Sequence, residues 1–165
     1  MSALLQFDPP PQREAMHLVD LDAVLEIEYA AYEFPWTRGN FVDSLAAGYA
    51  AHVLRRADGG LSGYCVAMPG VEETHLLNLS IAPAWQHRGL ARGLLDALVA
   101  DCRVDGARCL WLEVRQSNAR AREVYRRYGF VQVGWRRSYY PAAAGQREDA
   151  CVMRLALDGS GNGLD

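Results

Sequence analysis

The sequence has 165 residues, of which 50% are hydrophobic and 22% charged, and its formal net charge is −3. This length suits one domain with a substantial core and is too short for two ordinary domains. Net acidity without a basic tail argues against direct nucleic-acid binding. The sequence contains neither an apolar run long enough to span a membrane nor a signal-peptide pattern, so we expect a cytoplasmic protein without a membrane partner.

The first predicted elements come directly after a proline-rich start. Residues 1–12 are expected to form a flexible leader, and a short strand is expected near residues 14–19. An amphipathic helix follows, with Asp20 or Asp22 as its N-cap.

The segment Phe34-Pro35-Trp36 ends that helix, and Thr37 is the expected cap of a second helix that continues to about residue 46. Residues 49–56 and 61–68 predict two strands. The sequence Asp58-Gly59-Gly60 between them is a hairpin turn signal.

The second half of the sequence alternates strands and helices. Strands are expected at residues 72–81, 109–115, 130–139 and 149–157, and helices after Gly89 and at residues 118–128. This order predicts a single domain at residues 13–158 of the α/β (α+β) class, with a mixed central sheet flanked by helices on both faces. Residues 159–165 are expected to be a disordered tail.

Charge is unevenly distributed along the chain. Residues 1–80 contain 11 acidic and 4 basic residues, whereas residues 81–165 contain 9 acidic and 13 basic residues, all of them arginine. A basic second half suits an anionic cofactor, and an acidic first half suits a cationic substrate. Charge alone is equally consistent with solvated faces that have no partner.

The cysteines and histidines do not form a metal-binding pattern. Cys65, Cys102, Cys109 and Cys151 are widely spaced without a C-x-x-C pair, and the four histidines are equally scattered. We therefore expect reduced thiols and no metal.

The loop before the helix at residue 90 is a candidate anion site. The first N–H groups of a helix lack internal acceptors, and Gly89 would let a phosphate approach them. A glycine here more often serves only a tight turn, with its neighbours solvated. However, Gln86-His87-Arg88-Gly89-Leu90-Ala91 resembles the Q/R-x-x-G-x-G/A signature of the GNAT acyltransferases, in which loop amides hold the pyrophosphate of acetyl-CoA.

Two side chains outside this loop are candidates for proton transfer. Glu113 lies on the same side of a buried strand as Arg115, which is consistent either with an ion pair or with a general base activated by partial burial. Tyr125 lies on the inward stripe of its helix, where a tyrosine is more often a core residue. Ser117 or Asn118 is a natural N-cap for that helix.

A family resemblance is carried by the segments FPW (34–36), LNLSIAP (77–83), LWLEVRQSNARAREVYRRYGF (110–130) and RRSYYP with REDA (136–150). Together they resemble the RimI-like ribosomal-protein alanine N-acetyltransferases of the GNAT superfamily, over about residues 14–157. This resemblance implies that Glu113 is the general base and Tyr125 the general acid. It implies acceptor contacts by Trp36, Tyr139 and Tyr140. It implies acetyl-CoA contacts by Leu79, Ser80, Ile81, His87, Arg88, Gly89, Leu90, Ala91, Arg92 and Asn118, and no metal.

Two departures from the family pattern concern the two substrates. Ala91 stands where the signature often has glycine, and the segment between Pro141 and Arg147 is one residue longer than the pattern. The Cβ of Ala91 would narrow the approach of the phosphate. The longer segment would alter the geometry of the loop on the acceptor side.

The resemblance implies that acetyl is transferred directly from acetyl-CoA to the N-terminal alanine of small-subunit ribosomal protein eighteen, whose basic tail would suit the acidic first half. One alternative is acetylation of a small amine, of other protein N-termini or of lysines. A catalytically silent CoA-binding module is the third hypothesis, which the presence of both Glu113 and Tyr125 disfavours. The oligomeric state does not follow from the sequence.

Overall fold

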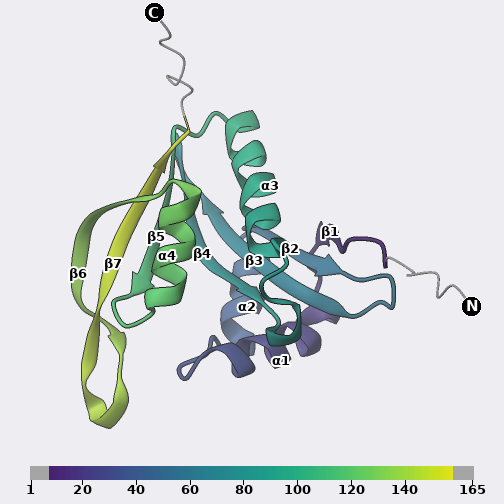
Figure 1. The fold of residues 1–165 in the computed structure, drawn as a ribbon, viewed down its shortest axis with the longest axis horizontal. Helices are drawn as coiled ribbons and strands as arrows, with labels where there is room; N and C mark the ends of the chain where they lie inside the picture. Colours follow the sequence, from purple (N-terminus) through teal and green to yellow (C-terminus); the bar gives the residue numbers. More distant parts are fainter. Residues whose placement is uncertain (1–7, 158–165) are drawn as a thin grey trace, which may run out of the picture.

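A computed structural model describes residues 8–157, whose strands form one seven-stranded sheet (Figure 1). Its spatial order is β1-β2-β3-β4-β5-β7-β6, and only β4 and β5 run parallel. The mixed sheet that the sequence predicts is confirmed. The strands are β1 (Gln12–Ala15), β2 (Ala50–Arg55), β3 (Leu61–Pro69), β4 (Glu73–Ile81), β5 (Cys109–Arg115), β6 (Val131–Pro141) and β7 (Arg147–Ala156).

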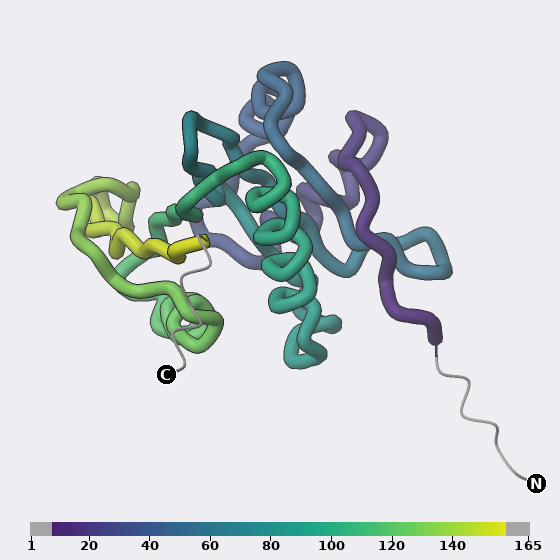
Figure 2. The backbone as a smooth tube through the Cα atoms, turned by 90° about the horizontal axis from the view of Figure 1, so that it is seen from above, coloured from purple at the N-terminus to yellow at the C-terminus, as the bar shows by residue number. Residues whose placement is uncertain are grey.

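Helices cover both faces of the sheet (Figure 2), and the buried side chains form two hydrophobic cores, one on each face. On one face lie α1 (Leu21–Ala31) and α2 (Arg38–Ala46), whose Val24 and Phe41 are fully buried. On the other face lie α3 (Leu90–Val104) and α4 (Ala119–Tyr128). The amphipathic stripe predicted for α3 is confirmed, because the apolar side chains of α3 are buried in the core on this face of the sheet.

The parallel pair at the centre of the sheet separates partway along its length. Register pairs join β4 and β5 only from Glu73↔Cys109 to Leu76↔Leu112. On its other side, β4 has a β-bulge, since Val66 pairs with Asn78 while Ala67 pairs with Leu76, which leaves Leu77 as the extra residue. The last residues of β4 and β5 therefore diverge and leave a gap in the middle of the sheet.

The start of the chain differs from the sequence prediction. Gln12, expected in the leader, already belongs to β1, because residues 12–15 pair with β2 in the register Gln12↔Arg55. Residues 18–20 form a 3-10 turn instead of the end of a strand. Asp20 precedes α1 as expected but does not cap it, since its carboxylate accepts from His17 N (2.9 Å) and Arg55 Nη2 (2.7 Å). The predictions for residues 1–7 and 158–165 lie outside the described residues.

The predicted cap of α2 and the predicted turn between β2 and β3 are confirmed. Thr37 caps α2 by accepting from Asn40 N at 3.2 Å. Gly59 takes a φ of 85° in the β2–β3 hairpin, a conformation that favours glycine. All four cysteines are free thiols. Within residues 8–157, none of the helices is long and apolar enough to cross a membrane.

Candidate active site

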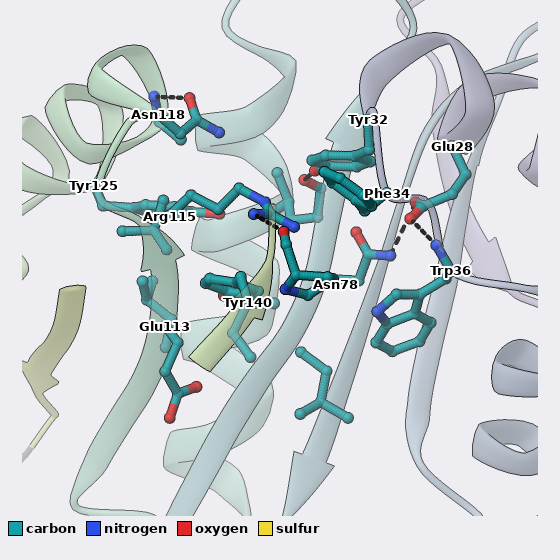
Figure 3. Close-up of a pocket in the computed structure, with 17 residues that line it drawn as sticks. Glu28, Tyr32, Phe34, Trp36, Asn78, Glu113, Arg115, Asn118, Tyr125 and Tyr140 are labelled. Carbon is teal, nitrogen blue, oxygen red and sulfur yellow. Dashed lines mark hydrogen bonds between the residues drawn. The ribbon is translucent and has the colours of Figure 1, made fainter. Parts of the chain in front are cut away.

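The gap between β4 and β5 opens into a pocket of about 310 Å³ (Figure 3). Residues from both diverging strands line it, together with side chains of α1, α4, the loop between α1 and α2, and the end of β6. The predicted residues that the structure brings together here are Trp36, Leu79, Glu113, Asn118, Tyr125 and Tyr140. The pocket therefore lies between the two layers of helices and is reached by side chains from distant parts of the sequence.

Glu28 of α1 is a buried carboxylate at one side of this pocket, with only 2% of the residue exposed. It accepts hydrogen bonds from the Trp36 backbone N–H (2.8 Å), the Asn78 side-chain amide (3.0 Å) and the Tyr64 hydroxyl. A buried charge needs such partners, because desolvation penalises it strongly. These contacts fix the position of Trp36 and join α1 to β3 and β4 (Figure 3).

Glu113 of β5 lines the same pocket, and its side chain is 7% exposed. One carboxylate oxygen contacts His75 Nε2, and the other lies 3.0 Å from Arg136 Nε. The ion-pair alternative is therefore met by Arg136 in place of Arg115, which pairs with Glu148 instead (3.6 Å). In Figure 3 the Glu113 carboxylate points away from Tyr125 and Asn118. The carboxylate therefore faces His75 and Arg136 and not the side of the pocket that holds Tyr125.

Tyr125 projects from α4 into the pocket and packs edge-on against Phe130, with ring centroids 5.5 Å apart. Removal from water raises the pKa of its hydroxyl above the usual value, and the neighbouring Tyr32 adds to the effect. Its hydroxyl therefore stays protonated beyond the usual range of pH and can donate a hydrogen bond. Tyr125 is thus partly buried, where it packs against the core and also forms part of the pocket wall.

Arg115 closes one end of the pocket as part of an aromatic stack. Its guanidinium lies 5.2 Å from the ring centroid of Phe34 and 4.5 Å from that of Tyr140. It also donates to the carbonyl oxygen of Pro141 at 2.8 Å. Such cation–π contacts are favourable. Arg115 therefore connects the loop after α1 with the β6–β7 hairpin over the pocket.

The loop before α3 has the backbone geometry of an anion-binding turn. Gly89 occupies the N-cap position with a φ of 77°, no side chain caps the helix, and an added Cβ would meet nothing within 4 Å. His87 also takes a positive φ, 62°. The N–H groups of Leu90 and Ala91 are in the first turn and Arg92 follows them, so this segment can hold a phosphate group. Arg88 lies over the Trp85 ring, 4.6 Å from its centroid.

The remaining predicted cofactor contacts lie beside the gap. Asn118 caps α4 by accepting from Ala121 N (3.1 Å), which confirms its predicted structural role. At the end of β4, the Tyr32 hydroxyl contacts Ser80 Oγ (2.7 Å) and donates to the Leu79 carbonyl (3.2 Å). Ile81 continues that strand into the loop that leads to α3.

One predicted acceptor residue lies apart from the pocket. Tyr139 is 42% exposed and does not line it, although its ring packs edge-on against Tyr140 with centroids 4.9 Å apart. The longer acceptor-side segment forms a short turn at Ala143–Gly145, in which Ala144 has a positive φ of 57°. A second hollow, of about 630 Å³ between α3 and α4, contains Arg92 as its single predicted site residue among those described.

Sequence reasoning missed several pocket residues. Glu28 could have been found, because it continues the stripe of Leu21, Val24 and Leu25 on α1, where a carboxylate is unexpected. Asn78 could not, because the bulge at Leu77 shifts the side chains that follow it to the opposite faces of the sheet. The remaining missed residues that contact site side chains are Tyr32, His75 and Arg136.

Comparisons with known proteins find relatives over most of the chain. Residues 21–130 match the model of the acetyltransferase (GNAT) family. The chain is 37% identical over 138 residues to the [ribosomal protein bS18]-alanine N-acetyltransferase of Haemophilus ducreyi, covering 84% of this chain and 94% of the relative. It is 35% identical over 143 residues to the protein of that name from Escherichia coli K12, covering 87% and 95%.

A solved structure resembles the whole domain. The crystal structure of the ribosomal-protein-S18-alanine N-acetyltransferase from Escherichia coli superposes with a TM-score of 0.81 and 34% identity. The match covers 93% of this chain and 98% of that one. The similarity therefore includes the strands and helices on both sides of the central gap.

Proposed function

This chain belongs to the GNAT family of acetyltransferases, and from that premise we propose that it transfers the acetyl group of acetyl-CoA to the N-terminal alanine of ribosomal protein bS18. The observation that carries the proposal is the pocket between β4 and β5, which joins a phosphate-binding loop on one side to a polar, aromatic acceptor side on the other. The similarity to bS18-alanine N-acetyltransferases over most of both chains supports the choice of acceptor. We place the enzyme in the cytoplasm.

Acetyl-CoA fits the residues at the mouth of this gap. The space around Gly89 leaves room for its pyrophosphate at the uncapped start of α3. Its pantetheine arm would extend between the diverging strands, alongside Leu79 and Asn118. A backbone N–H near the end of β4 would stabilise the oxyanion as the amine attacks the thioester.

Glu113 supplies the base in this proposal. A free α-amine has a pKa of about 7.7–8.0, so most of it is protonated at pH 7 and cannot attack. Because His75 and Arg136 occupy both oxygens of the Glu113 carboxylate, a water molecule would carry the proton from the amine to Glu113. After the attack, the Tyr125 hydroxyl would donate a hydrogen bond to the departing thiolate, whose pKa should be near that of cysteine, about 8.5, and would assist its protonation.

The acceptor would enter between Trp36 and the β6–β7 hairpin. Glu28 holds the Trp36 backbone and Arg115 holds the Tyr140 ring, so both walls are preorganised. An extended N-terminus between them would direct its α-amine toward the gap. The acidic first half of the chain would attract a basic ribosomal tail.

The proposal is tested with labelled acetyl-CoA and a set of peptides. We expect transfer to the α-amine of a peptide that begins with alanine and continues with basic residues. The control is the same peptide with a blocked α-amine and its lysines intact, which should not be acetylated. Mass spectrometry that places acetyl on lysine, or equal turnover of simple polyamines, would contradict the proposal.

A further inference from the structure

An arginine of α4 lies against the loop that precedes α3. Arg120 is in the first turn of α4, and its Nη2 atom lies 3.0 Å from Nε2 of His87. Asn118, one residue before α4, lines the pocket. The Arg120–His87 contact therefore crosses the mouth of the gap, from the helix that follows β5 to the loop that follows β4.

The partner of Arg120 is chemically unusual. A guanidinium has N–H donors and no acceptor, so the contact requires Nε2 of His87 to accept. Elsewhere in the same helix, Arg126 and Arg127 both contact the carboxylate of Glu123, at 2.6 and 2.9 Å. Across residues 8–157, no carboxylate pairs with Arg120. Its charge is therefore not neutralised by a carboxylate of the described residues, and an anion would be a stronger partner than the imidazole.

The segment beside Arg120 is open to such an anion. No side chain caps the first turn of α3, and a Cβ on Gly89 would meet nothing within 4 Å. The nearest basic residue along the loop, Arg88, is occupied by the Trp85 ring and the Ala84 carbonyl. Arg120 thus supplies the positive charge that reaches this loop from the far side of the gap.

We propose that Arg120 is a phosphate-binding residue that exchanges its contact with His87 for the diphosphate of acetyl-CoA. The inference rests on the proposed function in one respect, namely that the cofactor is acetyl-CoA. On binding, the guanidinium moves from the imidazole to the diphosphate oxygens, so that α4 and the loop before α3 hold the cofactor from two sides. No covalent bond changes in this step.

Calorimetric titration of CoA into the wild-type protein and Arg120→Ala tests the proposal. Arg120→Ala should weaken binding about five- to tenfold, as expected for one exposed charge-assisted contact. The matched control is Arg126→Ala, which removes the same charge from the same helix about 9 Å further along its axis. Its affinity should equal that of the wild type. Raising the salt concentration should reduce the difference in CoA affinity between the wild type and Arg120→Ala, because salt screens the charge of Arg120.

A second ligand identifies the phosphate group. CoA that lacks the 3′-phosphate retains the diphosphate, so Arg120→Ala should weaken its binding by the same factor. A loss seen only with intact CoA would overturn the diphosphate assignment, and unchanged affinity for both ligands would overturn the role of Arg120. Failure of the wild-type protein to bind CoA would instead contradict the proposed function. Arg120→Gln removes the charge but keeps much of the side chain. If it loses as much CoA affinity as Arg120→Ala, the loss comes from the charge and not from packing.

Discussion

The backbone N–H of Trp36 donates a 2.8 Å hydrogen bond to the buried carboxylate of Glu28, eight residues earlier in the chain. The same carboxylate accepts from Asn78 and Tyr64. One acidic side chain of α1 therefore determines where the loop after that helix lies beside the pocket, and its removal would leave three donors without their acceptor.

Glu28→Ala should lower the free energy of unfolding by about 2–4 kcal/mol, because buried donors left unsatisfied are costly. Urea denaturation measures this loss, and the KM for the acceptor should rise as Trp36 loses its support. Glu28→Gln retains one oxygen acceptor and should lose less stability. A Glu28→Ala variant as stable as the wild type would show that water replaces the carboxylate without cost.

Glu113→Gln should reduce the rate at neutral pH about a hundred- to ten-thousand-fold, the usual contribution of a general base. Part of the rate should return at high pH, where free amine is abundant. Steady-state rates from pH 6 to 9 measure both effects. Glu123→Gln makes the same chemical change on the surface of α4 and should leave the profile unaltered. Wild-type rates for Glu113→Gln throughout this range would rule out its role as base.

Tyr125→Phe should lower the rate at every pH from 6 to 9, without the recovery expected for Glu113→Gln. Burial raises the pKa of Tyr125, so its neutral form persists beyond the usual pKa of about 10. The wild-type profile should accordingly show no decline from tyrosine ionisation below pH 9. A descending limb near pH 8 that disappears in Tyr125→Phe would contradict this expectation.

Gly89→Val should weaken CoA binding markedly, since the added side chain would occupy the space at the start of α3. Gly106→Val is a matched control at the other end of that helix, because Gly106 has a similar φ of 80° and its surroundings are equally open. Both substitutions should cost about 1–2 kcal/mol of stability through backbone strain. Calorimetry should show lost affinity for Gly89→Val alone, and equal affinities would exclude the loop as the phosphate site.

The half-buried His52 makes stability depend on pH. Desolvation, assisted by the nearby Arg13, lowers the pKa of His52 in the folded state. The unfolded state therefore binds more protons as pH falls through about 6.5, and stability decreases toward acid. Urea denaturation at pH 7.5 and 5.5 should show this decrease, and His52→Gln should reduce it. An identical decrease in His52→Gln would assign the effect to other groups.

Local signals in the sequence were sufficient for most elements. The apolar run of residues 109–115 gave the bounds of β5, and Thr37 and Asn118 are the caps of α2 and α4. These features depend on neighbouring residues alone, through side-chain periodicity and capping hydrogen bonds. Glu113 and Tyr125 were selected by family resemblance, and their catalytic roles stay predictions.

Long-range contacts explain what the sequence could not provide. The stack of Phe34, Arg115 and Tyr140 joins three segments that are far apart in the chain. The local sequence makes Arg115 a natural ion-pair partner for Glu113. The groups that it contacts instead, the Glu148 carboxylate and the Phe34 and Tyr140 rings, come close only in the tertiary fold. The bulge at Leu77 also depends on a long-range contact, because it forms through the pairing of β4 with β3.

The position of β6 at the end of the sheet has a consequence for protein engineering. β6 pairs with β7 alone, and the turn at Ala143–Gly145 joins them, so the tip of this hairpin can be exchanged while β7 keeps its pairing with β5. Tyr139 and Tyr140 would move with it, whereas the glycine loop before α3 would stay. Under the proposed function, grafting the hairpin tip of another acetyltransferase would change the acceptor side and keep the glycine loop.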